Sequence, residues 1–524
     1  MQEKIYLDKE FDRFMRKIHS GENFTFLRFA DGERGLMHNS GFISQEGWIS
    51  PGRDTSLAEA LKDALQLKGE NVYYAISCPC CDREAYYWYM TRVPSRKNVT
   101  FSNIFINSNY KRFLTEFPSI NRDAIVIANY RGRNNPIGSL NVLKYYSVSD
   151  QCVDFWEHEA HDMIGRIIND YGDRDNLLYV ISAGPLTEPI IAALYRHNPN
   201  NCYVDFGSSI DIYIHRKDTR PYNQPGNKYA KRNCWMFDPK TTDFDVSVVL
   251  SAYKKPEALS AQLDALENQT LKPREIYLYQ DGIDGDYAIN FKPEILSRFT
   301  GTCINASNKG VWERFRFAMS AKSEYVCIFD DDTIPGRRWL ENCRYNTMLQ
   351  EGIYGTIGII VRDPQNYPKK CWRTGWRRPY GKTSRVDFVG HSWFLKREYL
   401  GWMFDGTEKY QGFKYTGEDM CLSFKAMQHG IKTFVPPHPF YDTELWGSVP
   451  EYGMKYGNDR NAVSMDDGNI KAMSDAMKMF ASEGWKFCID EQDSKSLKVY
   501  LCSKLGSCMK KVYDALRHRQ KIKA

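Results

Sequence analysis

The sequence lacks several features that would place it in a special class of protein. It has no apolar run of about 18 residues, so we expect no transmembrane helix. Its first residues, Met1 to Lys4, are mostly polar or charged, unlike a signal peptide, and we expect a cytoplasmic protein. The net charge of +6 over 524 residues does not resemble that of a dedicated nucleic-acid-binding protein. A mild positive excess does suit anionic small molecules or anionic lipid surfaces.

Cysteine is plentiful, with fourteen residues, but the spacing of a metal-binding motif is missing. Only Cys78, Cys80 and Cys81 lie close together, and no second pair of the CxxC type accompanies them. Zinc binding at this cluster is one interpretation. The pattern favours the other, which is a set of buried free thiols in a reducing compartment.

The chain has no short internal repeat, and its length suits two or more domains of roughly 100–200 residues. The segment 217–245 is rich in proline, glycine, asparagine and charge, which indicates a domain boundary near residue 240. On both sides, short apolar runs ending in polar turns alternate with stretches of helical spacing, and this alternation predicts mostly parallel sheets covered by helices. We therefore predict an α/β fold with two Rossmann-like nucleotide-binding domains in tandem, 1–240 and 241–490, followed by a helical basic tail, 491–524.

The individual elements follow from the same patterns. Before the boundary we predict strands over 24–29, 71–77, 124–128, 177–182 and 203–207, and helices over 153–168 and 188–195. After it we predict strands over 246–250, 275–279 and 325–329, and helices over 257–267 and 312–321.

The tail 491–524 combines an apolar stripe with many basic residues. The stripe repeats at helical spacing and consists of Leu497, Leu501, Leu505, Met509, Val512 and Leu516. A basic amphipathic helix of this type docks on anionic membrane. The alternative is a helix that packs on its own domain and exposes a solvated basic face. Gly506, in the middle of the helix, weakens both interpretations.

Three aspartates, Asp330, Asp331 and Asp332, directly follow the apolar strand predicted over 325–329. Ligands of open parallel sheets bind at the carboxyl ends of strands. Adjacent carboxylates repel one another unless a cation neutralises them, and Mg²⁺ or Mn²⁺ prefers such oxygen ligands. Asp330 and Asp332 point the same way along an extended segment, so we expect these two to hold the ion. The alternative is a solvated acidic turn.

Several segments of the second half resemble family 2-type glycosyltransferases of GT-A fold, in the order in which that family carries its motifs. Segment 246–282 resembles the start of the domain, 308–315 the Asn-x-Gly segment, 329–332 the DxD motif, 389–394 the acceptor-site stretch and 416–420 the Glu-Asp motif. The match covers roughly 245–445. Gln280 departs from the family, which often has Asp or another small polar residue there, and this departure puts base contacts in doubt.

This resemblance implies an inverting transfer, with the metal at Asp330 and Asp332 on the diphosphate and Asp419 as the general base. Glu418 would contact the acceptor beside Asp419. The nucleotide-sugar site would comprise Ser251, Tyr253, Asp281, Asn308, Gly310, Arg314 and Asp331. His391 and Trp393 would bind the acceptor, and Trp372 and Trp376 would line its groove. His438 is a further metal candidate, with a structural histidine in a proline-rich turn as the alternative.

The first half carries a second acidic motif, in which Arg28 precedes Asp31 and Glu33 at the end of an apolar strand. Segment 28–33 resembles the Arg-Phe-Gly-Asp-Gly-Glu motif of the GT-D glycosyltransferase family, and 182–185 and 204–208 resemble two later motifs of that family. Coverage is roughly 20–215. Ala30 replaces a glycine of the family, and Ser208 stands where the family usually has histidine.

The GT-D resemblance implies that Asp31 and Glu33 hold a metal–diphosphate and take part in catalysis. Arg28 would contact phosphate. Gly184 and Pro185 open a helix whose N-terminus attracts phosphate, and Asp205 and Ser208 would complete the site. Glu188 and Asp205 are candidates for its catalytic base.

Together the two resemblances imply a bifunctional glycosyltransferase that uses one Mn²⁺ or Mg²⁺ per domain. Its donors would be nucleotide-diphosphate sugars, UDP-sugars first among them, and its acceptor a glycan or lipid-linked glycan of the O-antigen or capsule type. It would be cytoplasmic, or peripheral on the cytoplasmic membrane face through its tail. One alternative has a single active GT-A domain and a first half that only binds acceptor. A sugar nucleotidyltransferase is disfavoured because the loop with Lys254 and Lys255 has no glycine to grip a triphosphate.

Overall fold

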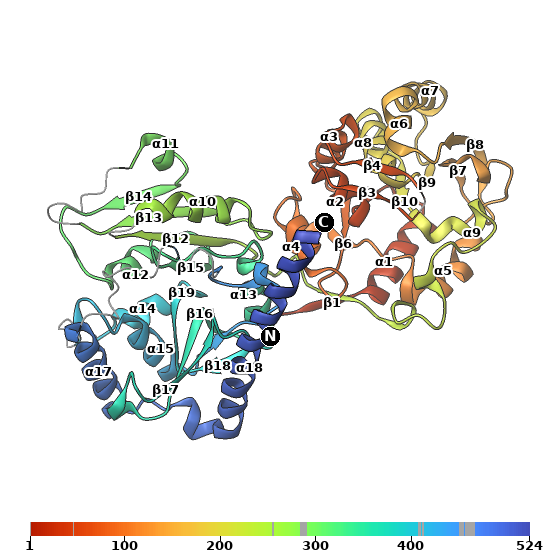
Figure 1. Cartoon of the computed structure of the whole chain (residues 1–524). Helices are drawn as coiled ribbons and strands as arrows, with labels where there is room; N and C mark the ends of the chain where they lie inside the picture. The colour runs from red at the N-terminus through yellow and green to blue at the C-terminus, as the bar shows by residue number, and fades with distance from the viewer. Residues whose placement is uncertain are drawn as a thin grey trace. The chain divides into compact units, whose positions relative to one another are not determined.

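The computed structural model describes residues 2–45, 47–253, 256–282, 291–406, 410, 413–449, 455 and 467–523, without the side chains of 492–494 and 518–523. The chain divides into two compact units, Gln2–Thr242 and Asp243–Ala524, which we call the first and second units. Both are built of parallel strands and covering helices (Figure 1). The predicted α/β class with tandem Rossmann-like units and a C-terminal helix is thus confirmed.

A seven-stranded sheet, parallel at every pairing, forms the centre of the first unit. Its order is β6-β5-β2-β10-β9-β7-β8. The strands are β2 (Thr25–Arg28), β5 (Val72–Ile76), β6 (Val99–Phe101), β7 (Asp123–Asn129), β8 (Asn141–Val148), β9 (Leu178–Ser182) and β10 (Cys202–Asp205). Because β2 starts the sheet in sequence and β10 ends it, the two neighbours mark the point where the strand order reverses. Ligands of doubly wound sheets bind at such a point.

The helices of the first unit are α1 (Leu7–His19), α2 (Asp31–Met37), α3 (Ser56–Leu65), α4 (Arg83–Met90), α5 (Tyr110–Glu116), α6 (Cys152–Phe155), α7 (His161–Tyr171), α8 (Thr187–His197) and α9 (Asp211–Ile214). Helix α1 buries an apolar stripe in which Phe14 packs edge-on against Phe26 and Tyr73 of the sheet. The single helix predicted over 153–168 is instead α6 and α7 joined by a π-helical turn, Trp156–Ala160. Two short hairpin strands, β3 (Gly41–Ile43) and β4 (Ile49–Pro51), complete the unit together with β1 (Lys4–Tyr6), which pairs with β11 (Trp235–Phe237).

The second unit contains a mixed sheet of order β14-β13-β12-β15-β19-β16-β20-β18, with β17 paired to β16. Its strands are β12 (Val246–Ala252), β13 (Glu275–Gln280), β14 (Gly301–Ile304), β15 (Tyr325–Phe329), β16 (Gly352–Val361), β17 (Cys371–Gly375), β18 (Ser384–Val386), β19 (Phe388–Lys396) and β20 (Lys432–Val435). The first four in this order are parallel; β12, β13 and β15 were predicted, whereas β14 was not. The antiparallel pairing of β15 with β19 was not predicted, and it places residue 391 opposite the aspartate cluster.

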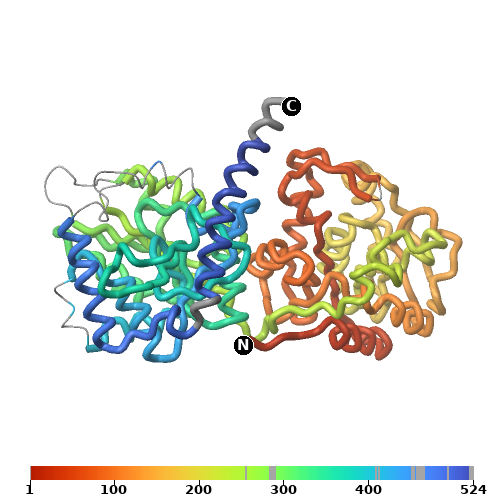
Figure 2. Tube along the Cα trace, turned by 60° about the horizontal axis from the view of Figure 1, so that its bottom comes forward, coloured from red at the N-terminus to blue at the C-terminus, as the bar shows by residue number. Residues whose placement is uncertain are grey.

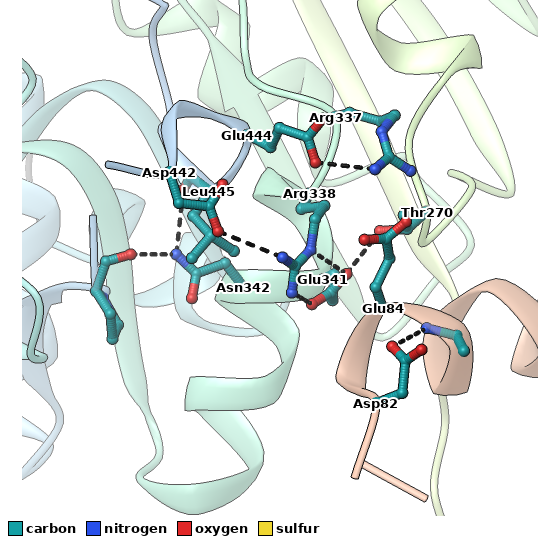
Figure 3. A network of polar contacts seen from close by, with 12 residues as sticks. Asp82, Glu84, Thr270, Arg337, Arg338, Glu341, Asn342, Asp442, Glu444 and Leu445 are labelled. Carbon is teal, nitrogen blue, oxygen red and sulfur yellow. Dashed lines mark hydrogen bonds and ion pairs between the residues drawn. The ribbon is translucent and has the colours of Figure 1, made fainter. Parts of the chain in front are cut away.

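The helices of the second unit are α10 (Leu259–Glu267), α11 (Pro293–Leu296), α12 (Glu313–Ala318), α13 (Trp339–Leu349), α14 (Tyr399–Phe404), α15 (Glu418–Gln428), α17 (Asp467–Ser482) and α18 (Cys488–Lys523). Figure 3 shows how polar contacts fix the start of α13. The Arg338 guanidinium lies 2.8 Å from the buried Glu341 and 3.4 Å from Asp442, and Arg337 pairs with Glu444 at 2.8 Å. These contacts tie the segment after the aspartate cluster to the turn at 442–445.

The tail forms a long helix, α18, which Figure 2 shows in dark blue running along the second unit. One face packs on this unit: the Tyr500 ring stacks on Trp372 at 4.9 Å, and Ser507 donates a hydrogen bond to the Arg377 carbonyl. A Cβ at Gly506 would lie 2.2 Å from the Pro379 carbonyl oxygen. The glycine therefore permits this close approach, which corrects the expectation that it weakens the helix assignment.

The opposite side of α18 keeps its apolar stripe in solvent. The exposed fractions are 40% for Leu497, 54% for Leu501, 63% for Leu505, 45% for Met509, 58% for Val512 and 56% for Leu516. No helix in the described ranges, α18 included, combines the length and the apolar character that crossing a membrane requires.

Candidate functional site

The candidate site of the second unit lies where the parallel strands β12, β13 and β15 end side by side. Ser251 is the last residue but one of β12, and Asp281 and Asp330 directly follow β13 and β15. The strands themselves are almost wholly buried, because their apolar runs pack between helices. The polar residues lie at the carboxyl ends of the strands. Their register therefore brings together polar groups that are about 80 residues apart in sequence.

The aspartate cluster meets a histidine that the sequence did not connect with it. One ligand atom each from Asp330, Asp332 and His391 lie within 4.8 Å of one another. The Asp330 N–H donates to the His391 carbonyl at 3.0 Å, because β15 and β19 are antiparallel neighbours. Gln262 fixes the turn by donating to the carbonyls of Asp330 and Thr333. Two carboxylates and an imidazole form a donor set suited to a divalent ion such as Mn²⁺.

The backbone of His391 adopts a left-handed conformation, with φ of +65°. Residues other than glycine rarely adopt it, and such strain often occurs at functional sites. The same is true of Trp376, with φ of +48°, whose ring lies 5.6 Å from that of His391. The structure thus places Trp376 beside His391, next to the aspartate cluster.

Arg314, from helix α12, connects the aspartate cluster with the Glu-Asp motif. Its guanidinium forms an ion pair with Asp330 and another with Glu418, at 2.9 Å. Burial alone would lower the pKa of Arg314, but the charges of Asp330 and Glu418 raise it. Burial raises the pKa of Glu418, against the influence of Arg314. The cation therefore holds two acidic motifs that lie 88 residues apart (330 to 418) in one site.

Asp419 is the second residue of helix α15, after Glu418, and its Oδ1 accepts a hydrogen bond from the Met420 N–H at 2.7 Å. Burial and then the neighbouring charge of Glu418 raise the pKa of Asp419 well above its ordinary value. Gly417 directly precedes the helix, with φ of +81°, a conformation that suits glycine and turns the chain into the helix. A carboxylate with a raised pKa is a stronger base once ionised, which suits a general base.

Asp281 serves the loop at 308–310 rather than presenting an open carboxylate. Its Oδ1 accepts from the Lys309 N–H at 2.7 Å and its Oδ2 from the Gly310 N–H at 3.0 Å. Asn308 in turn donates to the Tyr253 hydroxyl at 3.0 Å. Each carboxylate oxygen of Asp281 thus accepts a backbone N–H, and Asp281 holds this loop in place.

The hydroxyl of Ser251 is buried and has no hydrogen-bond partner among the residues that the structure describes. A buried polar group without a partner is unusual, so this hydroxyl is available to a ligand at the end of β12. Lys254 and Lys255, in the loop that follows, lie outside the described residues.

Two other predicted site residues are buried and make their polar contacts within the fold. Trp393 is 2% exposed, donates to the Val389 carbonyl and lies beneath the Arg314 guanidinium. It therefore supports Arg314 instead of stacking on an acceptor. His438 is 3% exposed, and both of its ring nitrogens face backbone carbonyls, those of Pro436 and Arg378. His391, not His438, belongs to the aspartate group.

The candidate site of the first unit lies where β2 and β10 end as neighbours. Arg28 ends β2, and its Nε donates to Oδ2 of Asp205, the last residue of β10, at 2.8 Å. A Cβ at Gly207 would lie 2.7 Å from the Arg28 Nε, so only glycine lets the backbone pass over the guanidinium. Ser208 shares a hydrogen bond with the Tyr222 hydroxyl at 2.9 Å. The resembling motifs around 28 and 205 thus meet at the reversal point of the sheet.

Two further buried carboxyl groups, Glu33 and Glu188, lie around Arg28. Burial, followed by the charges of Asp205 and Glu33, raises the pKa of Glu188 well above its ordinary value. Burial likewise raises the pKa of Glu33 and of Asp205. Arg28 thus offsets the charge of three carboxyl groups, those of Asp205, Glu33 and Glu188. We call these four residues the Arg28 cluster. The raised pKa values of the carboxyl groups favour protons shared among them.

Asp31 and Glu33, which the sequence predicts as a metal-ligand pair, have different surroundings. Asp31 is exposed, whereas Glu33 is 4% exposed and accepts a hydrogen bond from the Ala30 N–H at 2.8 Å. Both lie in helix α2, and residues two apart on a helix point in different directions. Gly184 and Pro185 form the turn before α8, as predicted, and Glu188 lies in the first turn of that helix.

Comparisons with known proteins give little further information. No protein-family model matches the chain, and no curated protein matches it. A solved structure described as the domain of unknown function 1792 with a distinct glycosyltransferase fold is 15% identical, with a TM-score of 0.29, and the match covers 40% of this chain and 81% of that one. TarS of S. aureus is 14% identical, with a TM-score of 0.28, and the match covers 38% of this chain but only 37% of TarS. Similarity at this level does not show a family or an activity.

Proposed function

We propose that the second unit is a metal-dependent glycosyltransferase. The observation that carries the proposal is the convergence of Asp330, Asp332 and His391 beside Glu418 and Asp419, with Arg314 between the two groups. A metal-type donor set and a partly buried carboxyl with a raised pKa lie within one polar site. Transfer from a nucleotide-diphosphate sugar to a hydroxyl uses groups of both kinds.

Asp330, Asp332 and His391 would hold Mn²⁺ or Mg²⁺, which when bound neutralises charge on the diphosphate leaving group. Asp419 accepts the proton of the acceptor hydroxyl, and Glu418 is held by Arg314 beside it. Ser251 offers its unpartnered hydroxyl to the nucleoside. Inversion, a UDP-sugar donor and a glycan acceptor of the O-antigen or capsule type belong to the same proposal and rest on the sequence resemblance.

The proposal is tested with the variant Asp330→Asn/Asp332→Asn in the full chain. We expect its Mn²⁺ affinity, measured by electron paramagnetic resonance in the presence of UDP, to fall on the order of 100-fold, and its sugar transfer in a screen of nucleotide sugars to be lost. Asp264→Asn is the matched control, because Asp264 lies on the surface of α10 and outside the ligand group, and it should leave Mn²⁺ affinity within about twofold. Unchanged affinity in the double variant would overturn the metal site.

A second transferase site in the first unit is a further candidate. The observation that favours it is the Arg28 cluster at the reversal point of a doubly wound sheet, where such folds bind nucleotides. In the Asp330→Asn/Asp332→Asn variant, any transfer that persists and is then removed by Asp31→Ala would support two active sites. If no transfer persists, the first unit is better described as a binding module for the acceptor glycan.

We further propose that α18 binds an anionic membrane surface. Its exposed apolar stripe lies on a helix that also carries Lys498, Lys504, Lys511 and Arg517, and such helices combine apolar insertion with attraction to anionic lipids. Vesicles containing phosphatidylglycerol should pull down the full chain in sedimentation, and Leu501→Ser/Leu505→Ser should weaken binding at least tenfold, since each leucine removed from lipid lowers affinity severalfold.

The control for vesicle binding is Leu114→Ser, which changes an exposed leucine of the first unit and should leave binding unchanged. Added salt should weaken binding to the anionic vesicles, because salt screens the basic residues. Equal binding of wild type and the double variant, or equal binding to neutral vesicles, would contradict a membrane role for this helix.

A further inference from the structure

The first unit brings four cysteine sulfurs together at a place outside the Arg28 cluster. Cys78, Cys80 and Cys81 lie in the turn between β5 and α4, and Cys234 directly precedes β11. All four Sγ atoms lie within 4.8 Å of one another. Cys234 is 153 residues away from Cys81, which is why the local spacing of the first three gave no sign of a fourth ligand.

The size of this sulfur cage fits one ion. A tetrahedral Zn²⁺ with Zn–S bonds of about 2.3 Å holds its sulfurs about 3.8 Å apart, and the Sγ–Sγ distances here include 3.1 Å for Cys78–Cys80 and 3.6 Å for Cys81–Cys234. An iron–sulfur cluster spreads its four thiolates over two or four irons and needs a wider cage. A disulfide needs about 2.05 Å, and all four residues are free thiols.

The surroundings of the cage suit a closed, negatively charged centre. Cys78 and Cys234 are buried, whereas Cys81 is exposed. The Asn103 amide donates to the Cys234 Sγ at 3.4 Å, and Arg232 donates to the Cys80 carbonyl at 2.8 Å while its charge faces Cys81. Donors and a cation around thiolates offset the excess negative charge of four sulfurs on a divalent ion.

We propose that Cys78, Cys80, Cys81 and Cys234 bind one Zn²⁺ in a structural site. Four protein ligands fill a tetrahedral zinc, so no position remains for a substrate. The ion would fasten Cys234, and through it β11 and its partner β1, to the turn after β5. The segment that ends at Cys234 also contains Tyr222, whose hydroxyl shares a hydrogen bond with the Ser208 hydroxyl beside the Arg28 cluster. The zinc therefore holds in place the segment that reaches the candidate site of the first unit.

The first test measures metal in the full chain, purified without immobilised-metal chromatography and dialysed against micromolar zinc and then zinc-free buffer. Inductively coupled plasma mass spectrometry should find one zinc per chain that resists dialysis. Exchange for Co²⁺ should produce the thiolate-to-cobalt absorption of a tetrahedral sulfur site, which the carboxylates and histidine of the second unit do not give. Iron or copper in place of zinc, or no retained metal, would overturn the proposal. So would a disulfide between any of the four cysteines in protein purified under reducing conditions.

Variants then assign the ligands. Cys234→Ser should lose the retained zinc and the thiolate–cobalt band, whereas Cys152→Ser should keep both, because Cys152 is equally buried in the same unit but lies outside the cage. Since Cys234→Ser can also fail to fold, wild-type protein provides a second measurement. Titration with a thiol-specific mercurial should release one zinc as four thiols react, read by a chromogenic chelator. Zinc release that does not track those thiols, or zinc retained by Cys234→Ser, would contradict the assignment.

Discussion

Asp419→Asn is expected to lower kcat for sugar transfer by about 10²–10⁴-fold, the usual contribution of a general base. The asparagine keeps an oxygen that can accept the Met420 N–H, as Oδ1 of Asp419 does at 2.7 Å, so the start of helix α15 should persist. Only the proton acceptor is lost. Because Asp419 does not belong to the Asp330, Asp332 and His391 group, the KM for the donor and the Mn²⁺ affinity should change little.

The matched control for Asp419→Asn is Asp264→Asn, at a carboxylate on the surface of α10 in the same unit, and its kcat should equal that of wild type. Initial rates with saturating donor and varied acceptor separate kcat from KM. A kcat for Asp419→Asn within tenfold of wild type would exclude Asp419 as the base. A matching fall in donor affinity would indicate a binding role instead.

The raised pKa of Asp419 also predicts a pH dependence. Protonated Asp419 cannot accept a proton, so kcat/KM should fall as pH decreases through this pKa, and its acidic limb should lie above the ordinary carboxyl range near 4. Burial and the charge of Glu418 raise the pKa, Asp330 adds to this, and Arg314 opposes it. Glu418→Gln removes one of the raising charges and should move the limb to lower pH. A limb that stays in place would belong to another group.

Much of this site could be predicted because its strands have a strong local signature. The runs at 246–250, 275–279 and 325–329 are short, apolar and followed by polar residues, and the structure has β12, β13 and β15 there. Their parallel neighbours follow from the alternation with helices. Asp281 and Asp330 therefore lie at the same edge of the sheet, after the two neighbours of β12, and this placement follows from the strands alone.

What the sequence could not provide are contacts that depend on distant pairings. His391 joins Asp330 only because β19 runs antiparallel to β15, and nothing near residue 391 shows that pairing. Burial decides other roles in the same way. Trp393 is an aromatic residue in the stretch that resembles an acceptor site, yet the Arg314 guanidinium lies over its ring. Gly506 reads locally as a helix breaker, and only its contact with Pro379 shows why a glycine is there.

In the first unit, too, the meeting of strand ends could be predicted and the orientation of side chains could not. The motifs at 28–33, 182–185 and 204–208 predict which strand ends meet, and Arg28 does reach Asp205. The orientation of Asp31 and Glu33 depends on where helix α2 begins, because in an extended segment they would point the same way and in a helix they do not. That boundary is among the least predictable features of a sequence.

Arg28→Leu is expected to destabilise the first unit by about 3–5 kcal/mol at neutral pH, the usual effect of removing one partner from a buried ion pair. Arg28 is the cation whose charge acts on Asp205, Glu33 and Glu188, and leucine would leave these buried carboxyl groups without it. Urea unfolding followed by hydrogen-exchange mass spectrometry of peptides from residues 2–242 measures the loss separately from the second unit.

The sign of the pH effect follows from the direction of the shifts. Carboxyl groups with pKa values raised in the folded state favour the fold when protonated, and this contribution is lost as pH rises from the unfolded value through the folded one. The deficit of Arg28→Leu should therefore shrink toward pH 4–5.

Adding Glu188→Gln should recover part of the stability at neutral pH, because it removes one of the repelling carboxyl groups. Arg112→Leu, which removes an arginine that pairs with two carboxylates on the surface, should change stability by at most about 1 kcal/mol. Equal losses for Arg28→Leu and Arg112→Leu, or no gain from Glu188→Gln, would mean that these carboxyl groups do not depend on Arg28 for their charge balance.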